Sequence, residues 1–444
     1  MNKREIYLPM EIYSREYLGK LALTLEFLKR NLIVYLGANH AIRALAMGAV
    51  AGGIFFETKG MTPSGMNHLA SLKNSGLILV GQDEEAGISF KSFESFAKFR
   101  PEIHGLEIFD KFFTWGQDDQ MYISSLTPGA NLVQTGSAKS LFWGSFGEKF
   151  YAEEAQISRE SIGDYVLIIS NLSMKNNLIS KKQMNRYLYK SGYKKDEYDF
   201  TKREIWEELA FKKIIEIVET ISKKTSFKVV LRPHPSEDVE PWNKLFQHNS
   251  NVKVSKKGNI VATILGARHV LHAGSTAGLE SLLLGKSTLS YQNLVGFEDE
   301  EMFANTYSQS LNSLEDLVMK LNSGDSFPPL PGFLEIARRK LSCFGEYGVI
   351  ENQVSEILEI VERTSNSNLI EMGGDLKKTG TLKRVFERIR FGKSNFEKLS
   401  SNKRPQINSS DLEFDLKKLQ KLLSYEFHVE IHQLADSTFR IERI

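Results

Sequence analysis

The sequence contains one cysteine, Cys343, among its 444 residues. A single thiol excludes an intrachain disulfide and any metal site built from several cysteines, and it is typical of proteins from a reducing compartment. No stretch approaches the roughly 18 uncharged apolar residues of a membrane-spanning helix, so we expect none. The N-terminal MNKREIYLPMEIYSRE carries charges where a secretion signal needs an apolar core, so we expect a cytoplasmic protein.

Two ligand signatures are also missing. The stretch LGANHAIRAL, from Leu36 to Leu45, begins a helix with one glycine and lacks the GxGxxG pattern of dinucleotide-binding folds. His40, His68 and His104 do not have the spacing of metal ligands. We therefore expect no metal ion and no cofactor.

The composition is that of a globular protein, with 41% hydrophobic and 25% charged residues. A chain of 444 residues is too long for one ordinary core, so we expect two domains with appended segments. The net charge of +2 conceals an asymmetry, because residues 376–404 hold ten Lys or Arg and two Glu. That segment carries a charge of +8, so the rest of the chain is mildly acidic.

Apolar runs of strand length alternate with amphipathic stretches through most of the chain. The run EIYLPM, for example, is followed by a helical pattern starting at Ser14, a plausible N-cap, and then by the run NLIVYLG. This alternation predicts an α/β fold of two Rossmann-like, doubly wound domains that face a cleft, the usual position of a ligand in such folds. The expected boundaries are 1–150 for the first domain, 160–330 for the second, 331–365 for helices that pack back on the body and 366–444 for a basic C-terminal extension.

The stretch HVLHAGSTAGLESLLLG is typical of an anion-binding turn. A strand ends before Gly274, which allows a tight turn, and Ser275 and Thr276 then begin a helix. The free backbone N–H groups and the dipole of that helix attract a phosphate. Gly278 lets the helix approach a ligand or a neighbouring strand closely, and Glu280 is placed to reach a ribose diol. An ordinary capped helix with a solvated glutamate is the alternative.

The stretch LRPHPSED follows another predicted strand. Its two prolines hold Arg232 and His234 extended, because a residue that precedes proline avoids the helical region. The imidazole, with Pro235 behind it, can donate to a phosphate, and the guanidinium adds a permanent charge. A turn histidine bonded to backbone is the alternative. We favour phosphate binding because the stretch lies one strand–helix unit before the glycine turn.

The stretch LVGQDEEAG ends a strand of the first half with three consecutive carboxylates, Asp83, Glu84 and Glu85. Neighbouring carboxylates raise one another's pKa, as a general base or acid requires. An acidic, solvated loop is the alternative.

Three further residues are candidates for substrate contact. Glu11 and Arg15 follow the first strand, and Lys59 follows the strand of FFETKG. A cation here would pair with an anionic substrate, whereas a surface ion pair or plain solvent exposure is the alternative.

The basic segment 376–404 interleaves its cations with Phe386, Ile389, Phe391 and Phe396. This pattern suits an anionic lipid surface, and a plain surface helix is the alternative. No nucleic-acid recognition motif accompanies the segment, so we expect no nucleic-acid partner.

Four stretches taken together resemble bacterial surface carbohydrate biosynthesis proteins: YLPMEIYSREYLGKLALTLEFLKRNLIVYLG, DEEAG, RPHP and GSTAGLESLLLGK. These are GT-B glycosyltransferases, similar at these motifs to capsule Kdo transferases and bacterial sialyltransferases. The resemblance covers residues 4–320. It implies that 1–150 is an acceptor domain and that 160–330 is a nucleotide-sugar domain.

The resemblance also implies roles for residues. In the sialyltransferases a D/E-D/E-G motif supplies the base, while an HP motif and a Ser/Thr pair hold the CMP of the donor. His234, Pro235, Ser275 and Thr276 would accordingly hold CMP, and the 83–85 cluster would supply the carboxylate. Ala86 interrupts the motif in this chain, so which carboxylate acts stays open.

The function implied by the resemblance is that of a metal-independent glycosyltransferase. Its donor would be a CMP-activated ulosonic acid, Kdo or a sialic-like sugar, and its product lipopolysaccharide, capsule or a related surface glycan. The carboxylate would deprotonate the acceptor or, in a retaining enzyme, attack the anomeric carbon, while Arg15 or Lys59 would pair with the carboxylate of the sugar.

The acceptor would be a glycan or a lipid-linked molecule, and residues 376–404 would keep the enzyme at the inner face of the bacterial inner membrane. A UDP-sugar or CDP-polyol donor and a non-catalytic GT-B-like scaffold subunit are the alternatives.

Overall fold

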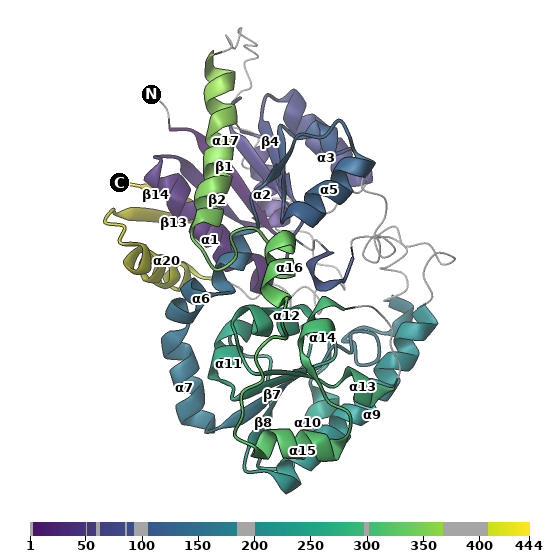
Figure 1. Cartoon of the computed structure of the whole chain (residues 1–444). Helices are drawn as coiled ribbons and strands as arrows, with labels where there is room; N and C mark the ends of the chain where they lie inside the picture. The colour runs from purple at the N-terminus through teal and green to yellow at the C-terminus, as the bar shows by residue number, and fades with distance from the viewer. Residues whose placement is uncertain are drawn as a thin grey trace. The chain divides into compact units, whose positions relative to one another are not determined.

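The chain folds into two compact units, labelled by element in Figure 1. The computed structural model describes residues 3–49, 51–58, 63–84, 87–92, 105–183, 200–296, 302–366 and 407–444. The first unit is built from 1–86, 103–141 and 340–444, and the second from 87–102 and 142–339. The C-terminal part of the chain thus belongs to the same unit as the N-terminus.

The first unit contains a sheet with the strand order β13-β14-β2-β1-β3-β4-β5-β6. Its strands are β1 (Glu5–Met10), β2 (Ile33–Ala38), β3 (Ile54–Glu57), β4 (Ile78–Gln82), β5 (Lys111–Thr114), β6 (Leu132–Gln134), β13 (Val429–Ala435) and β14 (Thr438–Arg443). Its helices are α1 (Tyr13–Lys29), α2 (Asn39–Ala46), α3 (Pro63–Asn74), η2 (Leu106–Ile108), α5 (Gln117–Leu126), η3 (Ala138–Phe142), α17 (Gly348–Asn366) and α20 (Ser409–Leu423).

Helices cover both faces of this sheet. Tyr7, Phe55 and Leu79 point to the face on which α2, α3 and α5 pack. Side chains alternate along a strand, so their neighbours Leu8, Phe56 and Val80, also fully buried, point to the opposite face. There α17 contacts α1 and β4. Apolar side chains on both faces explain why these strands have nearly continuous hydrophobic sequences.

The described C-terminal residues complete the first sheet. Residues 407–444 form α20 and a hairpin of β13 and β14, and β14 pairs antiparallel with β2. A Cβ atom on Gly37 would lie 2.5 Å from the carbonyl oxygen of Ser437, so only glycine allows this close approach. The basic segment 376–404 lies outside the described residues.

The second unit contains a parallel sheet with the order β12-β11-β10-β7-β8-β9. Its strands are β7 (Tyr165–Ile169), β8 (Lys228–Arg232), β9 (Val252–Val254), β10 (His269–His272), β11 (Thr288–Ser290) and β12 (Gln309–Ser310). Its helices are η1 (Gly87–Ser89), α6 (Ser145–Phe150), α7 (Ala152–Ile162), α9 (Phe200–Lys224), α10 (Glu240–Phe246), α11 (Ile260–Gly266), α12 (Thr276–Leu283), α13 (Gln292–Val295), α14 (Phe303–Tyr307), α15 (Leu314–Asn322) and α16 (Phe333–Lys340).

The core of the second unit also has two layers. Val166, Val229 and Leu271 pack with α9, α10 and α15 on one face. The opposite face contacts α12, which packs on α11, and α11 packs on α7. The predicted α/β class with two doubly wound, Rossmann-like units is therefore confirmed.

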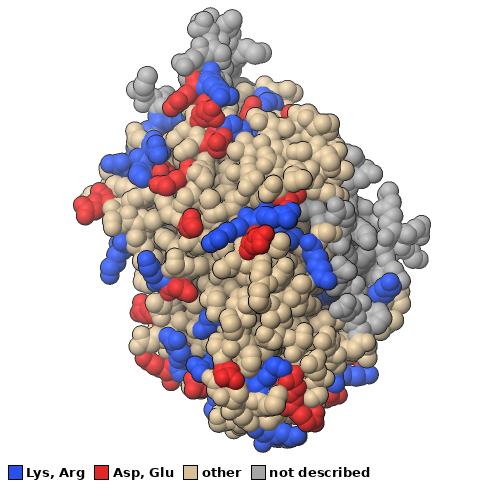
Figure 2. Space-filling model, viewed as in Figure 1, with Lys and Arg blue, Asp and Glu red and all other residues tan. Residues whose placement is uncertain are grey.

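Two surface properties bear on function. None of the helices in the described residues is long and apolar enough to cross a membrane. Figure 2 shows acidic and basic side chains interspersed over most of the described surface that faces the viewer.

Candidate functional site

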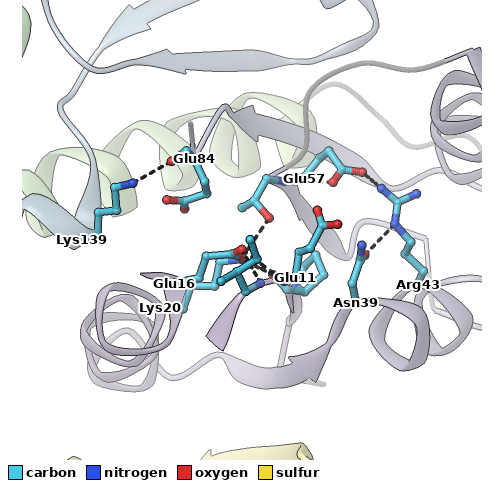
Figure 3. Close-up of polar contacts among 11 residues, drawn as sticks. Glu11, Glu16, Lys20, Asn39, Arg43, Glu57, Glu84 and Lys139 are labelled. Carbon is cyan, nitrogen blue, oxygen red and sulfur yellow. Dashed lines mark hydrogen bonds and ion pairs between the residues drawn. The ribbon is translucent and has the colours of Figure 1, made fainter. Parts of the chain in front are cut away.

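Polar side chains gather where β1, β3 and β4 of the first unit end. These strands are parallel, so their carboxyl ends meet at one edge of the sheet, the edge at which α/β proteins usually bind ligands. Figure 3 shows the side chains that extend from this edge and from the start of α1.

Glu16 and Lys20 form a buried ion pair one turn apart on α1. Nζ of Lys20 lies 2.8 Å from Oε2 of Glu16, and only 2–3% of either side chain is exposed. The ammonium also donates to Oγ1 of Thr58 at 3.1 Å and to the carbonyl of Pro9. The ammonium thus has three oxygen partners, which offset the free-energy cost of burying its charge.

Glu16 also fixes the start of α1. Its carboxylate accepts from the backbone N–H of Ile12 at 2.8 Å and of Glu11 at 3.1 Å. Burial acts to raise the pKa of Glu16, but Lys20 and these two N–H donors hold it below its usual value. The expectation that Ser14 caps the helix is wrong: α1 begins at Tyr13, and its N-cap Ile12 has no side-chain cap. The carboxylate of Glu16 instead reaches back to the backbone N–H groups of the N-cap Ile12 and of Glu11 before it.

Glu84, two residues after the end of β4, is a buried carboxyl group. It is 8% exposed, and its Oε2 has no hydrogen-bond partner among the described residues. Burial raises the pKa of Glu84, and Glu16 acts in the same direction. The cations Lys139, Lys20 and Arg15 oppose this rise. Figure 3 shows Glu84 between Lys139 and the Glu16–Lys20 pair.

The other two predicted carboxylates differ from Glu84. Asp83 is partly exposed, and its carbonyl oxygen accepts from Nε1 of Trp115 at 2.6 Å. Glu85 and the candidate cation Lys59 lie outside the described residues. Of the described carboxylates in the 83–85 cluster, Glu84 is therefore the buried one.

A second polar group borders the same edge of the sheet. Arg43 donates to Oδ1 of Asn39 at 2.8 Å and forms an ion pair with the buried Glu57. The candidates Glu11 and Arg15 lie at the start of α1 and are partly buried. The structure thus places Glu11, Arg15 and Glu84 in the same region of the first unit.

In the second unit, hydrogen bonds hold the loop after β8. Both terminal nitrogens of Arg232 donate to backbone carbonyls, one to Lys257 and the other to Gly258 at 2.6 Å. Burial lowers the pKa of Arg232 to about 10, which leaves the guanidinium charged at neutral pH. Nδ1 of His234 lies 2.7 Å from Oγ of Ser236. The imidazole is partly buried. Pro235 follows and is exposed.

Glu237 organises this loop from the interior. The residue is fully buried, and its Oε1 accepts from the backbone N–H of His234 at 2.9 Å and from Oγ of Ser170 at 2.6 Å. Its Oε2 accepts from Nε1 of Trp242 at 3.0 Å. The carboxylate behind the HP motif thus sets the backbone position of His234.

The turn after β10 has the predicted geometry. Gly274 has a φ of 82°, a conformation that favours glycine, and α12 begins at Thr276. Oγ of Ser275 accepts from the backbone N–H of Gly278 at 3.0 Å, so this serine is the N-cap. A Cβ atom on Gly278 would lie 2.6 Å from the ring of His272, so the neighbouring strand requires this glycine.

Thr276 and Glu280 differ in exposure at the start of α12. Thr276 is exposed and its Oγ1 lies 2.9 Å from Oγ of Ser89 on η1. Glu280 is 9% exposed. The hydroxyl of Thr276, rather than that of the N-cap Ser275, is thus at the surface of the turn, and sequence reasoning missed Ser89.

Sequence reasoning also missed Glu16, Lys20 and Lys139 of the first unit. A Glu and a Lys four residues apart inside an otherwise apolar helix are a detectable signal for the first two. Lys139 is 55 residues from Glu84 along the chain, and no local pattern indicates their contact.

Among the described residues, one cluster has metal-ligand chemistry. Glu430, His432 and Glu442 bring ligand atoms within 4.8 Å of one another on the β13–β14 hairpin. Glu442 also forms an ion pair with Arg440. We assign these residues to cross-strand pairing, which stabilises an edge hairpin.

Comparisons with known proteins give a distant likeness in fold. No protein-family model and no curated protein matches the chain. The wall teichoic acid polymerase TagF is 9% identical, with a TM-score of 0.41 over 70% of this chain and 73% of that one. HepE from Anabaena, solved with UDP and glucose, is 10% identical, with a TM-score of 0.41 over 81% of this chain and 100% of that one. The UDP-GlcNAc 2-epimerase from Methanocaldococcus jannaschii is 11% identical, with a TM-score of 0.46 over 81% and 100%. Because these TM-scores are below 0.5, the functional proposal rests on the chain's own side chains.

Proposed function

We propose that the chain is a glycosyltransferase in which Glu84 activates the acceptor and the second unit binds the nucleotide of the donor. One observation carries this proposal. Glu84 is a buried carboxyl group at the carboxyl edge of a parallel sheet, and its Oε2 has no partner among the described residues. An unsatisfied carboxylate oxygen in such a position is costly unless a ligand or a proton completes it, and strongly perturbed carboxyl groups are characteristic of catalytic sites.

The reaction follows from this role. The ionised Glu84 takes the proton of an acceptor hydroxyl while the acceptor oxygen forms a bond to the anomeric carbon of the sugar. The bond between that carbon and the phosphate oxygen breaks, and the nucleotide leaves with the electron pair. A raised pKa makes Glu84 a stronger base than an exposed glutamate, and positioned bases of this kind contribute about 10²- to 10⁴-fold to rates.

The second unit has the groups that a leaving phosphate requires. Nε2 of His234 and the hydroxyl of Thr276 are the proposed donors, and the N-terminus of α12 adds a favourable dipole. Arg232 contributes charge while its nitrogens bind backbone carbonyls, and Gly274 shapes the turn. Pro235, Ser275, Gly278 and Glu280 are proposed to keep the loop and the helix in this arrangement.

The acidic loop and the donor unit are adjacent in the chain. Only Glu85 and Ala86 separate Glu84 from Gly87, the first residue of the second unit in that segment. Ser89, two residues further on, bonds to Thr276. The segment 84–89 thus links, along the chain, residues proposed for the two roles.

The finer identity of the donor is also a proposal. The sequence resemblance favours a CMP-activated ulosonic acid such as Kdo or a sialic acid, transferred to a glycan or lipid-linked acceptor of the bacterial surface. In that case Arg15 and Lys59 are candidates to pair with the carboxylate of the sugar. A UDP-sugar or a CDP-polyol donor fits the same phosphate-binding groups. The basic segment 376–404 is proposed to hold the enzyme on an anionic membrane.

A thermal-shift series with CMP, UDP and CDP tests the proposal. A ligand that binds the folded chain at 100 times its Kd stabilises it by about 2.7 kcal/mol. We expect stabilisation by CMP, and His234→Ala should weaken it. Stabilisation by UDP or CDP alone would replace the ulosonic-acid donor with one of the alternatives. No response to any of the three would contradict the transferase and favour a non-catalytic subunit.

A further inference from the structure

Two side chains donate hydrogen bonds to the backbone of the loop that carries Glu84. Nε1 of Trp115 donates to the carbonyl of Asp83 at 2.6 Å, and Nζ of Lys139 donates to the carbonyl of Glu84 at 2.7 Å. These carbonyls belong to consecutive residues. Nζ of Lys139 also lies 4.5 Å from the centre of the Trp115 ring, so the two donors contact each other by a cation–π interaction. We call Trp115 and Lys139 the loop clamp.

Trp115 is itself fixed by its surroundings. It follows β5 directly and is fully buried. Its backbone N–H donates to Oδ2 of Asp119 at 2.8 Å, and its carbonyl accepts from the N–H of Ser342 at 2.7 Å. Because the Trp115 ring is buried and both of its backbone groups are bonded, its indole N–H has a fixed position. It therefore holds the carbonyl of Asp83 in one place.

Lys139 is fixed through the backbone of η3. A Cβ atom on Gly19 would lie 2.7 Å from the backbone nitrogen of Lys139, so η3 rests directly on α1 at this glycine. Lys20, the next residue of α1, belongs to the buried ion pair with Glu16. The clamp and the charges around Glu84 are therefore parts of one packed arrangement.

We propose that Trp115 and Lys139 are positioning residues, which hold the loop after β4 so that the carboxyl group of Glu84 is presented to the acceptor hydroxyl. This inference rests on the proposed function. Hydrogen bonds to the carbonyls of Asp83 and Glu84 fix the backbone at these two residues. The position of the Glu84 carboxyl group then depends on the torsions of its own side chain. Misplacing a catalytic group by about 1 Å can reduce a rate by about 100-fold, so a loop without its clamp should react slowly.

Substitutions of Trp115 and of Lys139 should have different effects on the reaction rate and its pH dependence. Lys139 adds a positive charge beside Glu84, together with Lys20 and Arg15, while Glu16 adds a negative one. Trp115 adds no charge. Removing Lys139 should therefore change both the rate and its pH dependence, whereas removing the indole N–H should change the rate alone.

The test compares Trp115→Phe, Lys139→Met, Lys139→Arg and the Trp115→Phe/Lys139→Met double variant. Turnover of CMP-sialic acid, or of the UDP or CDP donor that the thermal-shift series selects, is measured between about pH 5 and pH 9. For Trp115→Phe and Lys139→Met we expect kcat to fall about 10- to 100-fold with little change in the donor KM. In Lys139→Met the acidic limb of the profile should also move to higher pH, and Lys139→Arg should restore it. The double variant should lose less than the product of the single losses, because both residues act through one loop.

Two matched control substitutions change a tryptophan and a lysine that do not belong to the loop clamp. Trp206→Phe removes an indole N–H that donates to Gln292 at 3.3 Å in the second unit, and Lys73→Met removes a lysine paired with Asp110 at 2.6 Å in the first. Both should keep wild-type kcat and the wild-type profile.

A spectroscopic readout separates this inference from the proposed function. Trp115 lies beside the loop, so its fluorescence, taken as the difference between the wild type and Trp115→Phe, should change with pH as Glu84 titrates and should be flat in Glu84→Gln. Wild-type kcat in both clamp variants, with activity lost in Glu84→Gln, would overturn the clamp and leave the proposed function standing. Full activity in Glu84→Gln would instead overturn Glu84 as the base.

Discussion

The polar side chains at the carboxyl ends of the parallel strands have different hydrogen-bond partners in the two units. At the strand ends of the second unit, His234 and Ser275 bond within a few residues, to Ser236 and Gly278. Other polar side chains there have distant partners, since Arg232 bonds Gly258 and Glu237 bonds Ser170. At the strand ends of the first unit, partners are distant, since Lys20 bonds Thr58 across 38 residues and Lys139 bonds Glu84 across 55. The second unit thus has loops whose backbone is fixed by hydrogen bonds. The first has a buried charge network around Glu84, whose Oε2 has no hydrogen-bond partner among the described residues.

The largest effect should come from breaking the network of the first unit at its centre. Lys20→Met leaves the buried Glu16 carboxylate without its counter-ion, so we expect the free energy of unfolding to fall by about 3–5 kcal/mol. Lys29→Met is the matched control on the same helix, because its ion pair with Glu26 is 3.5 Å long and 39% of its side chain is exposed. The control should cost less than about 1 kcal/mol. Urea unfolding measures both, and equal losses would mean that the Glu16–Lys20 pair is not the special feature of this unit.

The next effect should come from the loop of the second unit. Glu237→Gln replaces one of the two carboxylate oxygens with an NH₂ group, which cannot accept a hydrogen bond, so either the bond from His234 or the bond from Trp242 is lost. We expect a loss of about 2–3 kcal/mol in unfolding free energy and weaker nucleotide binding. The neighbouring Asp238→Asn, at a partly exposed side chain, should change both by much less. Unchanged nucleotide affinity in Glu237→Gln would show that the HP loop has no role in binding.

Two glutamates of the first unit should have opposite pH effects on stability. Burial raises the pKa of Glu84, so the folded state binds more protons than the unfolded state between about pH 4.3 and that higher value. In this window the free energy of unfolding falls as pH rises, and each unit of pKa difference corresponds to about 1.4 kcal/mol. Glu84→Gln, which does not titrate, should therefore gain stability over the wild type as pH rises.

Glu16 has a lowered pKa, so its contribution to stability is present above about pH 4.3 and is lost as pH falls through its folded value. Glu16→Gln should therefore be less stable than the wild type at neutral pH, and the difference should shrink in acid. Urea midpoints from about pH 3.5 to pH 8 measure both variants. Parallel curves for the two would contradict the assignment of separate proton affinities.

The smallest effect should come from the turn of the second unit. Ser275→Ala removes the N-cap of α12 and should cost about 1 kcal/mol. Thr276→Ala changes an exposed hydroxyl and should cost within about 0.5 kcal/mol, yet it should weaken nucleotide binding more than Ser275→Ala does. Calorimetric titration with CMP compares them. A stronger binding loss in Ser275→Ala would reverse the roles assigned to the two hydroxyls.

The same contrast explains what the sequence could predict. The alternation of apolar runs predicts both doubly wound units, because each strand–helix pair is local. The turn at Gly274 was predictable because glycine adopts a positive φ readily and serine or threonine is preferred at the start of a helix. The positions of Gly274, Ser275 and Thr276 agree with the sequence expectation, and their roles in binding a donor are proposals.

Other features depend on contacts that no local pattern encodes. The sequence predicts only a basic extension after residue 366, whereas residues 407–444 complete the first sheet by pairing with β2, some 400 positions earlier. The three consecutive carboxylates suggest equal candidates, yet the structure buries Glu84 in a loop whose backbone accepts hydrogen bonds from the distant Trp115 and Lys139. Burial of one member of an acidic run is a tertiary property, so sequence could name the cluster but not the residue.

The most direct test of the account uses Glu84→Gln and His234→Ala side by side. For each variant, nucleotide affinity and release of sugar from the corresponding donor are measured on the same preparation. We predict that Glu84→Gln binds the nucleotide like the wild type and loses at least about 100-fold in turnover, whereas His234→Ala loses affinity. Wild-type turnover in Glu84→Gln, or unchanged nucleotide affinity in His234→Ala, would contradict the division of acceptor activation and donor binding between the two units.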